Sequence, residues 1–184
     1  MSKGKLFVIS GASGVGKSTV LKQVMEQRED LTFSVSATTR QPRPGEVDGI
    51  SYYFISREEF EERIARGEFL EYDEHHAVLY GTLNSQILEK QEHSHVILDI
   101  EPNGAFNVRK ARPDATLIFI MPPSREELER RLRSRGDTSE EQITIRRARA
   151  DWEMEQSAKY DHVVINDRVE ACAEQILNII ADKA

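Results

Sequence analysis

Near its N-terminus the chain reads Gly11-Ala12-Ser13-Gly14-Val15-Gly16-Lys17-Ser18, which fits the pattern G-x-x-x-x-G-K-S/T. An apolar run from Leu6 to Ile9 precedes it and predicts a buried strand, and residues 17–28 predict a helix with one apolar face. Glycines let a backbone curl so that several N–H groups point into one concavity, and a helix N-terminus adds partial positive charge. The stretch therefore predicts a loop that binds the phosphates of a nucleoside triphosphate.

The polar side chains of this loop have expected roles. Lys17 should reach the β- and γ-phosphates, and the Ser18 hydroxyl should ligate Mg²⁺. The alternative is a glycine-rich turn that binds no ligand, which the full spacing and the flanking elements disfavour. The residues expected to bind the triphosphate here are Gly11, Ala12, Ser13, Gly14, Val15, Gly16, Lys17, Ser18 and Thr19.

Length and composition exclude several classes of protein. The 184 residues suit one domain with a smaller insertion, and the net charge of −7 argues against a nucleic-acid coat or a basic membrane-surface protein. No apolar run approaches the roughly 18 residues of a membrane span, and the first apolar stretch is too short for a signal peptide. The single cysteine, Cys172, excludes an internal disulfide, and its apolar context predicts a buried thiol. We expect a cytoplasmic protein that binds neither nucleic acid nor membrane, and its oligomeric state stays open.

Apolar runs alternate with helical patterns along most of the chain. The later runs are His95–Ile100, Thr116–Met121 and Val163–Ile165, and a last helix is expected over about 169–181. Runs that are apolar throughout are typical of parallel strands covered on both faces. The pattern predicts the α/β class with a doubly wound parallel sheet.

Two stretches interrupt this rhythm. Residues 33–82 hold short alternating pieces and a helix announced by the capping box that starts at Ser56, which predicts a small mixed sheet beside the core. Residues 124–150 are polar and rich in arginine, with helices expected to begin at Ser124 and Ser139. The short pieces assigned to the inserted sheet are Thr32–Ser36, Ser51–Ile55 and Phe69–Tyr72.

A second anion site is indicated by Arg40 and Arg43, which lie in a segment stiffened by proline and glycine. Guanidinium forks on a rigid loop suit bidentate binding of a phosphate. Solvent-exposed arginines beside Glu46 and Asp48 explain the same residues equally well, so both interpretations stay open at this point.

The same segment carries a family resemblance. Its residues Thr38-Thr39-Arg40, Arg43, Glu46, Gly49, Tyr52 and Phe54 resemble the signature of the guanylate kinase family, and the other motifs follow in the family's order. The resemblance covers essentially the whole chain and implies a P-loop NTPase fold, a doubly wound parallel sheet with an inserted small mixed-sheet domain for the nucleoside monophosphate and a helical lid. It implies a core of residues 1–32, 83–123 and 151–184, a GMP-binding domain of residues 33–82 and a lid of residues 124–150.

The resemblance also assigns residues to GMP. A carboxylate at Glu71 makes chemical sense, because it accepts from the N1–H and N2–H donors of guanine, which adenine lacks; such a mismatch discriminates by about 10⁴-fold or more. Without the family, Glu71 is interpreted as a solvated acid at a strand edge. The residues implied at GMP are Arg40, Arg43, Tyr52 and Tyr80 at the phosphate, Ser36, Glu71 and Thr82 at guanine, and in addition Glu46, Asp99 and Glu101.

Asp99 ends a predicted buried strand, at the edge where doubly wound sheets bind their ligands. It is expected to position Mg²⁺ through water or to contact the nucleotide, so Ser18 and Asp99 are the expected metal residues. The sequence departs from the family here. The usual Asp-Ile-Asp followed closely by Gln-Gly is replaced by Asp99-Ile100-Glu101-Pro102-Asn103-Gly104, which keeps the second charge one methylene further out.

Most arginines of residues 124–150 are expected to be surface charges paired with nearby glutamates. Arg135 and Arg146 resemble the family's lid arginines, which close over the triphosphate, and Asn166 resembles the position near the adenine of ATP. A charge-spread transition state needs cations at the transferring phosphoryl group. The residues expected to take part in catalysis are Lys17, Arg40, Arg135 and Arg146, and Arg135 and Asn166 join the expected ATP site.

The resemblance implies transfer of the γ-phosphoryl group of ATP to GMP with Mg²⁺, giving ADP and GDP; the use of dGMP stays open. One alternative is a kinase on the same scaffold that acts on AMP, dGMP or a phosphorylated sugar, which Glu71 and Ser36 argue against. Another is a non-catalytic interaction module. Such modules usually lose the phosphate loop, which is intact here.

Overall fold

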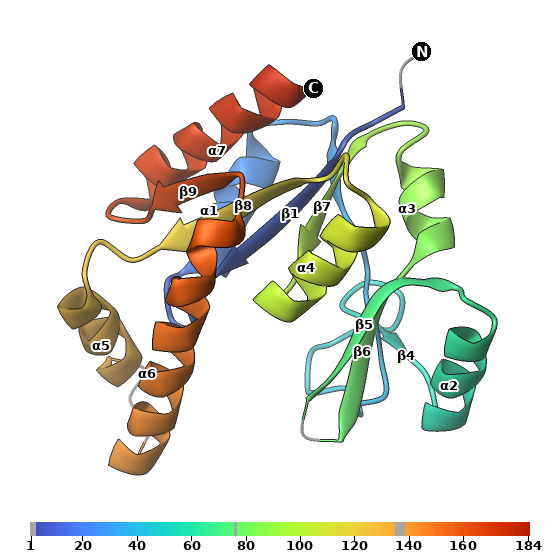
Figure 1. The fold of residues 1–184 in the computed structure, drawn as a ribbon, viewed down its shortest axis with the longest axis horizontal. Coiled ribbons are helices and arrows are strands. Elements are labelled where there is room, and N and C mark those ends of the chain that lie inside the picture. Colours follow the sequence, from blue (N-terminus) through green and yellow to red (C-terminus); the bar gives the residue numbers. More distant parts are fainter. Residues whose placement is uncertain (1–2, 76, 135–138) are drawn as a thin grey trace.

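The computed structural model describes residues 3–75, 77–134 and 139–184 of the chain. Within these ranges the larger sheet has five strands in the order β2-β7-β1-β8-β9 (Figure 1). Every neighbouring pair is parallel, so the carboxyl ends of the strands meet at one edge of the sheet. The strands span Leu6–Gly11 (β1), Leu31–Phe33 (β2), His95–Asp99 (β7), Thr116–Met121 (β8) and His162–Ile165 (β9).

Helices cover both faces of this sheet, and α5 and α6 extend from it together (Figure 1). Ser124 and Ser139 accept hydrogen bonds from backbone N–H groups at the starts of α5 and α6, which confirms both predicted caps. Among the described helices, none has the length and hydropathy that a bilayer span requires. The helices span Lys17–Glu26 (α1), Arg57–Ala65 (α2), Asn84–Lys90 (α3), Pro102–Ala111 (α4), Arg125–Arg133 (α5), Glu140–Glu155 (α6) and Val169–Lys183 (α7), with a 3₁₀ turn at Gln156–Lys159 (η1).

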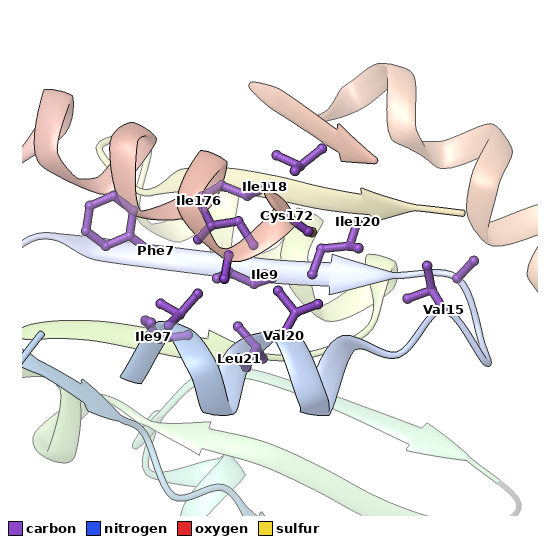
Figure 2. Close-up of a cluster of buried hydrophobic side chains, with 14 of the residues drawn as sticks. Phe7, Ile9, Val15, Val20, Leu21, Ile97, Ile118, Ile120, Cys172 and Ile176 are labelled. Atoms are coloured by element: carbon purple, nitrogen blue, oxygen red, sulfur yellow. The ribbon is translucent and has the colours of Figure 1, made fainter. Parts of the chain in front are cut away.

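Alternate residues of the strands enter two cores, one on each face of the larger sheet. Phe7 and Ile9 of β1 point to the face covered by α1 and α7, where Cys172 packs (Figure 2). Leu6 and Val8 join the opposite core, under α3 and α4. Burial on both faces explains why the strands are apolar throughout, and it confirms the predicted doubly wound α/β fold. The Cys172 thiol is buried as predicted, and burial raises its pKa to about 11.

The smaller sheet is mixed and has the strand order β4-β3-β6-β5 within the described ranges. Helix α2 covers it through Phe60, whose buried ring stacks on that of Phe69 with centroids 4.3 Å apart. The Ser56 hydroxyl accepts the N–H of Glu59, so α2 begins at the predicted cap. The strands span Ala37–Thr38 (β3), Tyr53–Phe54 (β4), Phe69–His75 (β5) and Val78–Leu83 (β6).

One predicted strand lies in the other sheet. The sequence pattern predicts Thr32–Ser36 in the inserted sheet, but β2 pairs in parallel with β7 of the larger sheet, with Leu31 opposite His95. The prediction is wrong because the pattern of a short strand indicates which face is buried and not which strand lies beside it. Helix α6 in turn continues past residue 150, the end of the predicted lid.

Candidate active site

The phosphate loop, residues 11–18, connects β1 to α1 at the carboxyl edge of the larger sheet. Gly14 and Gly16 adopt φ values of 85° and 90°, in the left-handed region that glycine enters without steric cost. A Cβ on Gly14 would also lie 2.6 Å from the Leu132 side chain. No described side chain caps α1, so its first N–H groups remain for a ligand.

Polar side chains from distant parts of the chain hold the backbone of this loop in place. The Val15 carbonyl accepts hydrogen bonds from Asn166 Nδ2 at 2.8 Å and from Arg131 Nη1 at 3.1 Å. The Ser13 N–H donates to Glu153 Oε2 at 2.7 Å. Asn166 is buried, so its amide supports the loop in this structure. Its place near adenine stays a prediction.

Lys17 and Asp99 form an ion pair at the carboxyl edge of the sheet. The register of β1 and β7 sets Ile9 opposite Asp99, which brings the carboxylate beside the start of the phosphate loop. Ser18 and Asp99 line one groove next to α1. A hydroxyl and a carboxylate are hard oxygen donors of the kind that Mg²⁺ takes together with substrate phosphates, so this pair fits the predicted metal site.

Glu46 holds Arg40 through two hydrogen bonds of 2.8 Å, one from Nη1 and one from Nη2. It also accepts the backbone N–H of Arg43 at 2.7 Å. These hydrogen bonds lower the pKa of Glu46 to about 2. Arg40 thus pairs with an acid, as one interpretation expected, while it and Arg43 also line a cavity, and phosphate binding by these arginines stays a prediction. Glu46 itself is not among the described residues that line the cavity, and it contributes by holding the side chain of Arg40 in place.

Tyr52 and Tyr80 form the wall beside Arg40. Their rings meet edge to face with centroids 6.1 Å apart, and the guanidinium carbon of Arg40 lies 5.3 Å from the Tyr52 ring centroid. Burial raises the pKa of Tyr52, which keeps its hydroxyl protonated as a donor. Two phenols and a guanidinium together suit the oxygens of a phosphate.

Glu71 lies buried on β5 and accepts a hydrogen bond of 2.7 Å from the Thr82 hydroxyl. Burial raises its pKa to about 7. A Cβ on Gly104 would lie 2.9 Å from Glu71 Oε2, so the glycine in α4 leaves room for the carboxylate. This burial excludes the interpretation of Glu71 as a solvated acid at a strand edge. A carboxyl group in such a place needs polar partners, and Thr82 occupies only one of its oxygens.

These groups surround one cavity of about 570 Å³, a volume suited to a nucleotide-sized ligand. Lys17 and Arg40 are both in its walls, so the phosphate loop and the second anion site open into the same space. The described residues that line it are Lys17, Ser36, Arg40, Arg43, Tyr52, Glu71, Asp73, His75, Val78, Tyr80, Gly81, Asp99, Ile100, Glu101, Gly104 and Arg149.

Sequence reasoning missed Asp73, His75 and Arg149 in this lining. Asp73 and His75 alternate with Glu71 along β5, and that period of two was a signal that they share its face. Arg149 lies on α6, and its approach to the cavity depends on how that helix packs.

The described lining of the cavity includes neither of the two predicted lid arginines. Arg135 lies outside the described residues. Arg146 is exposed on α6 and is not in the described lining. Their roles therefore stay predictions.

Comparison with known proteins gives consistent matches. Residues 3–183 match the family model described as guanylate kinase. A guanylate kinase of Trichormus variabilis is 49% identical over 176 residues, which are 95% of this chain and 88% of that protein. One of Thermus thermophilus is 47% identical over 181 residues, which are 97% of this chain and 81% of that protein. The crystal structure of guanylate kinase from Anaplasma phagocytophilum is 33% identical with a TM-score of 0.79, and the match covers 99% of this chain and 87% of that one.

A phosphate loop follows one strand of a parallel sheet, and a second cradle of arginines and tyrosines lines the same cavity. Together these features define a P-loop NTPase of the nucleoside monophosphate kinase class. Within that class, the chain belongs to the guanylate kinase family. The resemblance noted in the sequence is thereby confirmed, and so is the expectation of a nucleotide-binding kinase.

Proposed function

We propose that this protein transfers the γ-phosphoryl group of ATP to GMP, with ATP on the phosphate loop and GMP in the cavity. The observation that carries this proposal is that Lys17 and Arg40, from the two anion cradles, lie in the walls of the same cavity. Two phosphates held in one space meet without a covalent intermediate on the protein. A direct in-line transfer follows, because positioning and charge are what phosphoryl transfer requires of a protein.

The cations have separate tasks in this reaction. Lys17 binds the β- and γ-phosphates as a compact charge, and Arg40 with Arg43 holds the acceptor phosphate. Mg²⁺, held near Ser18 and Asp99, would neutralise charge on the triphosphate. The GMP phosphate is already an anion at neutral pH, so no strong base is needed. Arg135 and Arg146 approach the triphosphate as residues 124–150 close, which excludes water from the site.

Guanine is selected by Glu71, with further contacts from Ser36 and Thr82. The buried Glu71 carboxylate accepts from N1–H and N2–H of guanine, whereas adenine offers neither donor and would leave the oxygen that Thr82 does not occupy without a partner. Asp99 and Glu101, at the cavity edge, contact the nucleotide, and Asn166 lies near adenine of ATP. We place the protein in the cytoplasm, where ATP and GMP are its small-molecule partners.

A coupled kinase assay across nucleoside monophosphates tests this function. We expect GDP formation from GMP and ATP to depend on Mg²⁺ and to exceed the rate with AMP by about 10⁴-fold. The same assay with dGMP measures how much the rate depends on the 2′-hydroxyl of the acceptor nucleotide. Comparable rates with AMP would overturn the assignment to guanine, and a folded protein that forms no GDP would favour an interaction module.

A further inference from the structure

Three of the cations in the cavity wall share one arrangement, in which a carboxylate holds the side chain in place. The family resemblance accounts for Lys17 and Arg40, but it gives no role to Arg149. The three arrangements are Lys17 with Asp99, Arg40 with Glu46, and Arg149 with Glu101 and Glu153.

Arg149 is held by two of its three nitrogens. Its Nε donates to Glu153 Oε1 at 3.2 Å, and its Nη2 donates to Glu101 Oε2. Within the described residues, Nη1 has no acceptor, and the side chain is 38% exposed. Because Arg149 also lines the cavity, a guanidinium with both N–H donors of Nη1 to spare is fixed in its wall.

The two carboxylates place this guanidinium between the halves of the site. Glu153 accepts the Ser13 N–H of the phosphate loop, so Arg149 lies one side chain away from the triphosphate cradle. Glu101 Oε2 is 3.1 Å from His75 Nε2 on β5, and both residues line the cavity. Arg149 is therefore linked through carboxylates to both the phosphate loop and β5, and it lines the same cavity as Lys17 and Arg40.

We infer that Arg149 is a further catalytic residue, whose Nη1 donates to the oxygens of the phosphoryl group in transit. This inference rests on the proposed function. In the transfer, the bond from the γ-phosphorus to its bridging oxygen breaks, and a bond forms to an oxygen of the GMP phosphate. ADP leaves with the electron pair of the broken bond. Arg149 stays protonated throughout and stabilises the charge spread over the equatorial oxygens.

The departure of this chain from the family pattern supports the same role. Glu101 stands where the family has a shorter aspartate, and in this structure it meets both Arg149 and His75. The longer acid therefore contacts the arginine to which we assign the catalytic role.

Three variants of the full chain test the inference, namely Arg149→Met, Arg149→Lys and, as a control on the same helix, Arg147→Met. Arg147 is 61% exposed and pairs with Glu129, away from the cavity. We expect Arg149→Met to lower kcat by about 10²-fold with small changes in both KM values. Arg149→Lys should regain part of the rate, and Arg147→Met should match the unchanged protein.

A second readout separates catalysis from support of α6. ADP with aluminium fluoride and GMP mimics the transferring phosphoryl group, so Arg149→Met should weaken this complex far more than it weakens ATP or GMP alone. An equal loss for all three ligands, or an unchanged kcat, overturns the inference. GDP formation by the unchanged protein tests the proposed function separately, because it does not depend on any change at Arg149.

Discussion

Lys17 and Asp99 form an ion pair, although one follows β1 and the other ends β7. The two strands are parallel neighbours, with Ile9 opposite Asp99, so their carboxyl ends deliver a cation and an anion to the same edge. The pair holds the ammonium group at the mouth of the phosphate loop. An arriving triphosphate therefore meets a lysine that is already in position.

Lys17→Met should lower kcat by about 10³-fold, because the loop loses the one side-chain charge that meets the β- and γ-phosphates. The loop backbone does not need this side chain for its shape, so the free energy of unfolding should change little. Steady-state rates and urea unfolding measure the two effects. Near-normal turnover in a folded variant would remove Lys17 from the mechanism.

Glu71→Gln should raise KM for GMP much more than KM for ATP. The amide presents a donor where guanine also presents donors, while the phosphate loop is untouched. Glu74→Gln is the matched control, because Glu74 is an exposed acid on the same strand and outside the cavity lining. Equal losses for both substrates would mean that Glu71 has only a structural role.

KM for GMP should fall as pH rises from about 6 to 8, because the raised pKa of Glu71 lies near 7 and guanine binds the ionised form. The pH dependence of Glu71→Gln should lack this component, which separates it from titration of the GMP phosphate. A profile shared by both proteins would contradict the assignment.

The raised pKa of Glu71 also predicts how the stability of the ligand-free protein depends on pH. In the folded chain, Glu71 binds its proton more tightly than it does in the unfolded chain, where its pKa is 4.5. The stabilising contribution is therefore complete below about pH 4.5 and is lost as pH rises through 7. Urea unfolding of the unchanged protein against Glu71→Gln over this range measures it, and parallel curves would argue against a raised pKa.

Ser18→Ala should raise the Mg²⁺ concentration needed for half-maximal rate by about tenfold, since the variant loses the hydroxyl that we propose as an Mg²⁺ ligand. Gln23→Ala is a control on the same helix for effects on the helix itself, because Gln23 is outside the groove that Ser18 and Asp99 line. A Mg²⁺ titration of the rate is the measurement, and an unchanged half-maximal concentration would take Ser18 out of the metal site.

Phe60→Ala should lower the free energy of unfolding by about 3–5 kcal/mol, because a fully buried ring is removed from the small core under α2. Phe60 does not line the cavity, so any rise in KM for GMP would report loosening of the smaller sheet. Urea unfolding checks the main effect. A loss below about 1 kcal/mol would mean that Phe69 and its neighbours collapse into the space.

The hydrophobic periodicity of the sequence located most helices and strands, because each of them buries either one regular face or both faces. The run Thr116–Met121 is apolar at every position and forms β8, and the serines at 56, 124 and 139 cap the helices expected after them. The pattern of Thr32–Ser36 predicts the wrong sheet, because three paired residues carry too little information to name their neighbour strand.

The sequence by itself determined the phosphate loop, because eight consecutive residues and the helix after them supply the N–H groups, the lysine and the hydroxyl. Their geometry is local, so spacing is enough to specify it. Only the tertiary structure decided what faces that loop. Ser13 meets Glu153 across 140 residues, and Glu101 meets Arg149 across 48. Such pairs arise from the way strands and helices pack, and no short stretch of the chain contains that information.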